Sequence, residues 1–435
     1  MPHPSPFPRP PLRRWARAAS LLVLPAAFVV LVAAGDATAG DAWPQWGGPH
    51  RDFTSDAQGL ATAWPEGGPQ LVWERELGEG YSGLVAAGDR LYTLYHRGGE
   101  EVVVAVDAGN GATVWEIAYP APALPEMNLE HGPGPHATPA LAGERIFTIG
   151  STLKVHGLDR ATGRVLWAHD LVAELGAPVQ PRGFGASPLV WEDLVIVTPG
   201  GDGTAVVAFR QSDGARAWAS QSFRPSYSSP ILAEVGGEEQ VIVAMGPDRA
   251  GLDPRTGELE WRLTLRGEAA NVMATQIWGE DGVLFGSAAY TDGSRAIRVT
   301  REGEGKFAAE ELWFNTRMRV QHGTMVRLGD YVYGSSGDFG PTLLAAIHVG
   351  TGELAFRQRG FAKANLLAAG GHLLILDEDG VLAIGTPGPE GVDVHARARV
   401  LDRVAWTAPI LVGTRLYVRD RRHVKAFELG ARRSS

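Results

Sequence analysis

Short apolar runs separated by Gly- and Asp-containing turns recur along the chain, and no segment after the N-terminal residues has the period of an amphipathic helix. Each run has the length of one strand and lies beside a turn pair such as Gly88-Asp89 or Gly329-Asp330. Eight such turns occur between Gly88 and Gly413, roughly 46 residues apart, which is the spacing of four-stranded propeller blades. The pattern predicts an all-β chain of eight similar units.

A second phrase recurs within these units. Residues 158–167 are Leu-Asp-Arg-Ala-Thr-Gly-Arg-Val-Leu-Trp, and the same frame returns at 106–115, 209–218, 252–261 and 347–356. Gly supplies the positive φ of a hairpin turn, and the Trp on the following strand has a large apolar face that can fill the seam between blades. The predicted structural residues of the repeat are Trp73, Trp115, Trp167, Trp218, Trp261, Gly163, Gly257 and Gly352. Self-similarity of this kind indicates a β-propeller.

The two ends of the repeat region complement each other. The last unit, Pro409–Glu428, lacks an outer strand, and an orphan strand, Leu71–Arg75, precedes the first unit. Pairing the two closes the ring and removes an open sheet edge. We therefore expect an eight-bladed β-propeller of four-stranded antiparallel blades, closed by an N-terminal strand. The expected division of the chain is a signal peptide at 1–39, an extension with a Trp-Pro-x-Trp motif at 40–63, the propeller at 64–430 and a tail at 431–435.

The N-terminal residues have the composition of a secretory signal. Four arginines precede an apolar stretch from Ala18 to Ala34, and Ala37-Thr38-Ala39 provides a small-x-small cleavage site. We expect a mature chain that begins at Gly40 and lies in the periplasm or outside the cell. The alternative is an uncleaved membrane anchor, against which Pro25 and the shortness of the stretch argue. Sec and twin-arginine export both remain open.

Charge and cysteine content exclude several classes of function. The formal net charge is −9, without basic clusters, which is unfavourable for binding nucleic acid. The chain has no cysteine, which excludes disulfides, thiol catalysis, thiolate metal sites and lipidation at an N-terminal Cys. We expect a monomer that is not a lipoprotein, without a transmembrane domain in the mature chain and without a metal site.

The repeat unit resembles that of the pyrroloquinoline-quinone (PQQ) propellers. That superfamily includes quinoprotein alcohol dehydrogenases and the non-enzymatic propeller lipoprotein of the outer-membrane β-barrel assembly machinery. A group of exported bacterial PQQ-binding-like repeat proteins is more similar still, since its members open with a motif seen here from Trp43 to Asp52. Other matching stretches are 134–139, 227–230 and 321–323. The resemblance covers nearly all of 43–428, and it implies fold more strongly than activity.

The resemblance also implies what a quinoprotein site would contain. In the dehydrogenases the quinone lies at the axial mouth, held by Ca²⁺, stacked on a Trp, capped by a disulfide of adjacent cysteines and served by an Asp base. This chain cannot form the cap, and no stretch matches the metal-binding Glu and Asn or the Asp base.

The segment that enters each innermost strand is expected at the axial mouth, where propellers bind their ligands. These segments supply the candidate ligand-binding residues Tyr81, Ser82, His136, Tyr227, Ser228, Asn271, His322, Asn365 and Trp406, with Phe184, Ser187 and Thr407 in equivalent places. His136 and His322 belong to units four apart, so they should face each other across the channel. The alternative is that these Ser- and Pro-containing starts only serve strand entry.

We expect an exported cell-envelope propeller that acts as a binding or scaffold module, without catalysis and without a cofactor. Its partner would be an envelope protein, a peptide, a glycan or a small molecule. The alternative is a PQQ-dependent dehydrogenase with Ca²⁺ and an atypical site that lacks the vicinal disulfide. Catalytic residues cannot be assigned from the sequence.

Overall fold

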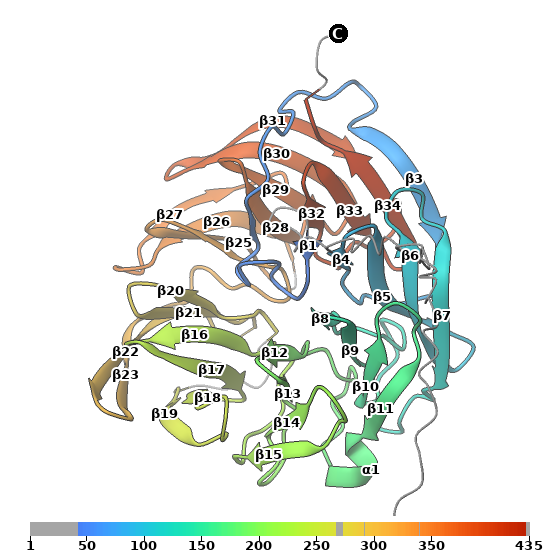
Figure 1. Cartoon of the computed structure of the whole chain (residues 1–435). Helices are drawn as coiled ribbons and strands as arrows, with labels where there is room; N and C mark the ends of the chain where they lie inside the picture. The colour runs from blue at the N-terminus through green and yellow to red at the C-terminus, as the bar shows by residue number, and fades with distance from the viewer. Residues whose placement is uncertain (1–41, 267–272, 291, 339, 432–435) are drawn as a thin grey trace, which may run out of the picture. The chain divides into compact units, whose positions relative to one another are not determined.

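Figure 1 shows strands arranged as a ring of sheets about a central axis. This computed structural model describes residues 42–266, 273–290, 292–338 and 340–431. The predicted signal peptide and Asn271 lie outside the described residues. Strand pairing within the described part forms eight sheets, of which six have four strands and two have a fifth strand from the N-terminal extension. The predicted eight-bladed propeller is confirmed.

The blades follow one another in chain order. Blade 1 has β4 (Val85–Ala87), β5 (Arg90–Arg97), β6 (Glu100–Asp107) and β7 (Thr113–Pro120). Blade 2 has β8 (Ala140–Ala142), β9 (Arg145–Ile149), β10 (Lys154–Asp159) and β11 (Val165–Asp170). Blade 3 has β12 (Leu189–Trp191), β13 (Leu194–Val197), β14 (Val206–Arg210) and β15 (Arg216–Ser220). Blade 4 has β16 (Ile231–Val235), β17 (Glu238–Met245), β18 (Asp248–Leu252) and β19 (Leu259–Thr264).

The second half of the ring repeats this order. Blade 5 has β20 (Ile277–Gly279), β21 (Val283–Ser287), β22 (Ser294–Gly303) and β23 (Lys306–Asn315). Blade 6 has β24 (Val326–Leu328), β25 (Tyr331–Ser336), β26 (Leu343–His348) and β27 (Leu354–Gln358). Blade 7 has β28 (Ala364–Ala369), β29 (His372–Asp377), β30 (Val381–Gly388) and β31 (Gly391–Arg399). Blade 8 has β32 (Ile410–Val412), β33 (Arg415–Arg419) and β34 (His423–Glu428). One short helix, α1 (Leu171–Leu175), follows blade 2.

The ring closes as predicted. Strand β3 (Gln70–Glu76) pairs antiparallel with β34 and so becomes the outer strand of blade 8, with Leu71 opposite Phe427. The fully buried Arg419 of blade 8 adds a second link, because its Nη1 donates to the carbonyl of Ser82 in the segment that enters blade 1, at 2.7 Å. Closure gives blade 8 a fourth strand, so that it has as many blade strands as each of the others.

The repeat tryptophans join consecutive blades. The indole Nε1 of Trp115, in blade 1, donates to the carbonyl of Arg160 in the turn of blade 2, at 3.0 Å. The ring lies over Gly163 of that turn, where an added Cβ would come within 2.4 Å of it. The same arrangement of indole, carbonyl and turn glycine occurs for Trp73 with Gly111, Trp167 with Gly214, Trp218 with Gly257 and Trp313 with Gly352. We call this pairing the Trp–Gly clasp.

The structure departs from the predicted repeat residues at one seam. Trp261 is buried, but its Nε1 donates to Gln240 in its own blade at 2.7 Å, because blade 5 has a long β22–β23 hairpin in place of the Thr-Gly turn. Trp313, which the repeat pattern did not single out, makes the clasp for blade 5. Trp167 is also buried, whereas Trp115 and Trp218 are only partly buried.

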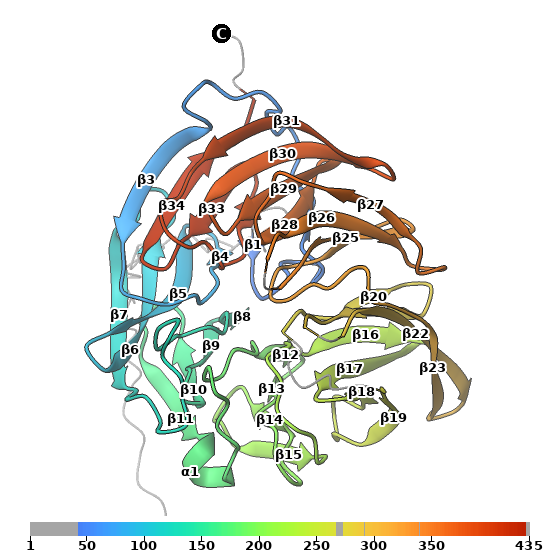
Figure 2. The ribbon, with the colours of Figure 1, turned by 180° about the vertical axis from the view of Figure 1, so that it is seen from behind.

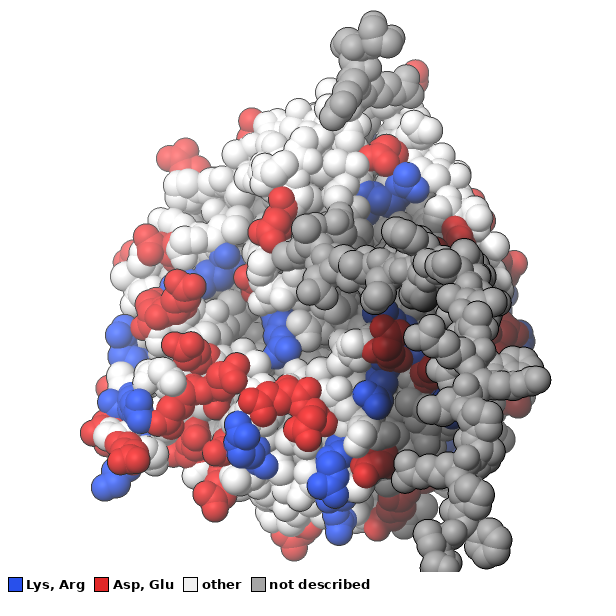
Figure 3. All heavy atoms as spheres, in the orientation of Figure 1, with Lys and Arg blue, Asp and Glu red and all other residues white. Residues whose placement is uncertain are grey.

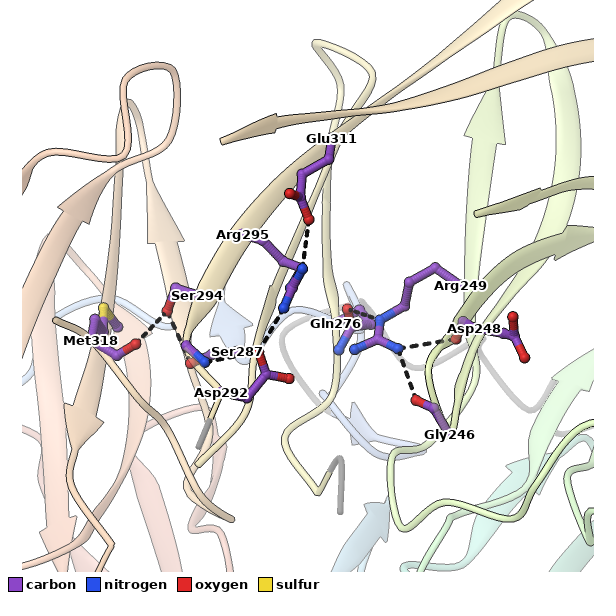
Figure 4. Close-up of polar contacts among 11 residues, drawn as sticks. Gly246, Asp248, Arg249, Gln276, Ser287, Asp292, Ser294, Arg295, Glu311 and Met318 are labelled. Carbon is purple, nitrogen blue, oxygen red and sulfur yellow. Dashed lines mark hydrogen bonds and ion pairs between the residues drawn. The ribbon is translucent and has the colours of Figure 1, made fainter. Parts of the chain in front are cut away.

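A buried arginine spans the seam between blades 4 and 5, where Trp261 does not form the clasp (Figure 4). Arg249 of blade 4 donates from Nε to Oε1 of Gln276, at the entry to blade 5, at 3.2 Å. Its Nη1 donates to the carbonyls of Gly246 and Asp248, and burial lowers the pKa of Arg249 to about 10. Arg295, in blade 5, is held by Asp292 at 2.6 Å. A hydrogen bond donated by a buried guanidinium therefore joins blades 4 and 5.

Among the described residues, no helix is both long enough and apolar enough to cross a membrane.

The clasp yields a test with two matched variants in blade 2. Gly143 and Gly163 both have positive φ, 52° and 73°, but only at Gly163 would a new Cβ meet the Trp115 ring. We expect Gly143→Ala to lower the free energy of unfolding by about 1–2 kcal/mol, the cost of a left-handed backbone. Gly163→Ala should lower it by a further 1–3 kcal/mol, roughly the cost of overpacking. Urea denaturation measures both values.

The control for this test is a Trp115→Ala background. Without the indole ring the two glycine variants should become equally destabilising. If Gly163→Ala remains the more costly variant there, contact with Trp115 is not the reason for the glycine.

Candidate functional site

A pocket of about 610 Å³ lies at the end of the ring where the chain enters each innermost strand, which we call the mouth. All eight entry segments contribute side chains to its lining, because equivalent segments of a closed ring lie at the same end of the axis. The contributing residues, in blade order, include Tyr81, His136, Ser187, Tyr227, Thr275, His322, Lys363 and Trp406. Trp46, from the N-terminal extension, also lines it.

Five of the candidate residues from the sequence meet in this pocket, and four of them form an aromatic arc. The Tyr81 ring stacks on His136 with centroids 5.7 Å apart, and it lies 5.2 Å from Trp406. Trp406 in turn contacts His322, again at 5.2 Å between centroids. Tyr227 lines the pocket beyond the arc. The arc offers ring faces in a concave site, as in many ligand pockets.

The two histidines of the arc are uncharged at neutral pH. Burial lowers the pKa of His136 to about 4. Burial likewise lowers the pKa of His322 to about 4, helped by the charge of Lys363. The pocket therefore presents them as neutral rings, able to donate and accept hydrogen bonds.

Three other candidates do not line the pocket, and their side chains join neighbouring blades. Ser82 donates to the carbonyl of Ala137 at 2.7 Å, and Ser228 donates to that of Ala274 at 3.1 Å. Asn365 donates to the carbonyl of Trp406 at 3.2 Å. All three side chains are buried. For these residues the strand-entry alternative describes the structure better. Phe184 is likewise buried, in the core beside blade 2, while Ser187 and Thr407 line the pocket.

Figures 1 and 2 both show β1 of the N-terminal extension near the centre of the ring. Strand β1 (Ala42–Trp43) pairs with β4 of blade 1, and β2 (Thr54–Ser55) pairs in parallel with β28 of blade 7. Between them Pro44 accepts from the backbone N–H of Leu141, in blade 2, at 2.8 Å. The extension thus bonds to blades on several sides of the ring.

The tight turn of this extension explains the residues of its motif. Gly47 and Gly48 have φ of 81° and 79°, and added Cβ atoms would come within 2.5 Å of the Arg51 backbone and 2.7 Å of the Trp43 ring. The turn carries Trp46 to the pocket, where its Nε1 donates to Oγ1 of Thr275 at 2.8 Å. The Trp-Pro-x-Trp motif was visible in the sequence, but only the fold places Trp46 in the lining.

Sequence reasoning also missed the charged residues of the pocket. Arg182 enters blade 3 and Lys363 enters blade 7, while Glu130 lies in the loop before blade 2. Arg182 and Glu130 form an ion pair at 3.2 Å. The signal that could have found Arg182 and Lys363 is their place in the same entry segments as the named candidates.

Tyr290 is a further pocket residue without a repeat signal. It has a φ of 63°, and Gln321 donates to its hydroxyl at 2.6 Å. Arg319 donates to its carbonyl at 2.7 Å, and Asp338 accepts from its backbone N–H at 3.0 Å. These three hydrogen bonds hold Tyr290 in its unusual backbone conformation, with its ring in the wall of the pocket.

Comparison with solved structures shows the fold. BamB from Moraxella catarrhalis superposes with a TM-score of 0.58 at 20% identity, over 83% of this chain and 99% of that one. A europium-containing methanol dehydrogenase gives a TM-score of 0.66 at 12% identity, over 87% and 89%. Quinohemoprotein alcohol dehydrogenase from Comamonas testosteroni gives 0.63 at 13% identity, over 91% and 81%. At these identities the likeness concerns the propeller alone.

Sequence comparison identifies the family. No curated protein sequence matches this chain significantly. A family model described as "Outer membrane protein assembly factor BamB" matches residues 99–353, from the third strand of blade 1 into blade 6. Because this match spans more than half of the chain, the protein belongs to that family of PQQ-like repeat propellers.

Proposed function

We propose that this protein is a binding module of the cell envelope that holds its ligand in the mouth pocket and has no catalytic activity. The observation that carries the proposal is the convergence of all eight entry segments and the N-terminal Trp46 on one concave, aromatic-rich site. A volume of about 610 Å³ lies within the range of small-molecule pockets, and it would also accommodate the end of a peptide or glycan.

Unpartnered polar atoms support a ligand in this pocket. His136 Nε2, Arg182 Nη1 and Gln321 Oε1 are buried and have no hydrogen-bond partner among the described residues. A buried polar atom without a partner costs free energy, about 1–3 kcal/mol. A ligand that supplies hydrogen-bonding groups at these three places would remove that cost.

The chemistry of the lining supports binding rather than quinone catalysis. Ca²⁺ is coordinated by about six to eight oxygen ligands in proteins, many of them from carboxylates. Glu130 is the single carboxylate among the described lining residues, and it is already paired with Arg182. The described residues contain no group of three or more His, Asp or Glu side chains placed to hold a metal ion. This donor set does not fit a calcium-held PQQ, so we derive no reaction through one.

The envelope location rests on the N-terminal sequence and on the family. A secretory leader would deliver the mature chain outside the cytoplasm. The family description refers to outer-membrane protein assembly, which supports a protein or peptide partner at the mouth. A glycan remains the second class of partner, since aromatic faces beside hydrogen-bonding groups suit sugars as well.

Trp406 provides the test of the pocket. We expect Trp406→Ala to weaken ligand binding tenfold or more, because the indole is the centre of the aromatic arc and buried aromatic anchors dominate binding energy. Calorimetric titration with a panel of short peptides, disaccharides and aromatic acids measures the affinity. The matched control is Trp64→Ala, a partly buried Trp outside the lining. Equal affinities for both variants and the unaltered protein would contradict the proposal.

The absence of quinone catalysis is tested by reconstitution. After incubation with PQQ and Ca²⁺ and removal of free cofactor, we expect no quinone absorbance on the protein and no alcohol-dependent dye reduction. The reason is the missing set of oxygen ligands. Stoichiometric quinone retention with dye reduction would establish the dehydrogenase alternative.

Export is tested on the protein in its own cell. We expect mass spectrometry of the envelope fraction to find a mature N-terminus at Gly40, because signal peptidase cuts after small-x-small sequences such as Ala37-Thr38-Ala39. Recovery of peptides from residues 1–39 on the intact chain would favour the anchor alternative.

A further inference from the structure

Lysine is rare in this chain, and one of its four lysines lies in the mouth pocket. Lys154 pairs with Asp170 at 3.7 Å, and Lys425 pairs with Glu74 at 3.3 Å. Lys306 is exposed at the start of β23. Lys363 differs from all three, because it is partly buried and its ammonium has no hydrogen bond or ion pair with any described residue.

Lys363 forms no ion pair with a described carboxylate. Glu378 is its nearest acidic neighbour along the backbone hydrogen bonds, since the Glu378 N–H donates to the carbonyl of Lys363 at 2.6 Å. The Glu378 carboxylate accepts instead from the indole Nε1 of Trp406, at 2.8 Å. His322, whose pKa the charge of Lys363 helps to lower, is a neutral neighbour. A partly buried ammonium without an ion-pair partner among the described residues is unfavourable, and an anion from outside the protein would provide that partner.

The opposite side of the pocket carries a second cation. Arg182 enters blade 3, four blades from Lys363 in blade 7, and so lies across the axis. Glu130 compensates part of its charge, while its Nη1 is among the buried atoms without a partner. Arg182, Lys363 and Glu130 together give the lining one net positive charge.

This positive pocket contrasts with the rest of the molecule. The chain has a formal net charge of −9, and Figure 3 shows acidic side chains gathered on one face over the region of β12 to β23. A general excess of basic residues therefore cannot account for the charge of the pocket. The cation is local, and it lies beside the aromatic arc.

We infer that the ligand carries a carboxylate or phosphate group that pairs with Lys363, next to a ring or apolar face that packs on Trp406. The inference rests on the proposed function, because it requires that the pocket bind a ligand. The anionic group would supply the counter-ion that Lys363 lacks, and charge-assisted hydrogen bonds of this kind are among the strong ones. Neutral and cationic analogues of the same shape would bind less well.

The experiment uses matched ligands that differ in charge. Calorimetric titration compares indole-3-acetate with indole-3-acetamide, glucuronate with glucose, and phenyl phosphate with phenol. For every pair that binds, we expect the acid to have an affinity at least tenfold higher than that of its neutral partner. This difference in affinity should shrink at high salt. Carboxylate and phosphate arms distinguish the two anionic groups.

Variants of the lysines identify the residue responsible. Lys363→Met should abolish the preference for the acid, Lys363→Arg should keep most of it, and Lys306→Met should leave it unchanged. The melting temperature of Lys363→Met should equal or exceed that of the unaltered protein, since the Lys363 ammonium bonds to no described residue. A lower melting temperature with an intact preference for acids would make Lys363 a structural residue and overturn the inference.

The outcomes separate this inference from the proposed function. If acids and neutral partners bind equally, and both lose affinity in Trp406→Ala, the pocket binds ligands but Lys363 does not select anions. If no member of the panel binds, or if binding is indifferent to Trp406→Ala, the proposed function fails and this inference fails with it.

Discussion

The fold depends on how one blade is fastened to the next. A four-stranded blade has two faces to bury and cannot bury them within itself, so every blade needs a neighbour on each side. At five of the eight seams the Trp–Gly clasp meets this need, because the indole ring fills the seam and its N–H satisfies a turn carbonyl of the next blade. The turn must be glycine for two reasons at once, its positive φ and the space that the ring occupies.

Closure of the ring creates the site. Once β3 completes blade 8, equivalent residues of the eight units lie at equivalent places around one axis, and their entry segments meet at the mouth. Small polar residues of these segments, such as Ser82 and Ser228, tie blades together, whereas the larger aromatic ones project into the pocket. The turn of the N-terminal extension adds Trp46 to the lining of this pocket.

The charges of the pocket give this scaffold its chemical character. The described lining combines aromatic rings, the neutral histidines His136 and His322, and Lys363, and it includes one carboxylate, Glu130. The shared fold accounts for the similarity to dehydrogenases without implying their reaction.

The sequence alone determined the blade count, the closure by Leu71–Arg75 and the mouth position of Tyr81, His136, Tyr227, His322 and Trp406. It could do so because repeats report local geometry, and a closed ring converts a shared place in the repeat into a shared place around the axis. Only the tertiary structure decided what the unrepeated residues do. Trp46 reaches the pocket from an extension that follows no repeat, and Trp313 takes the clasp in a blade whose turn has changed. Whether an entry residue such as Asn365 turns to its neighbour or to the axis depends on contacts between segments far apart in the chain, which no local pattern records.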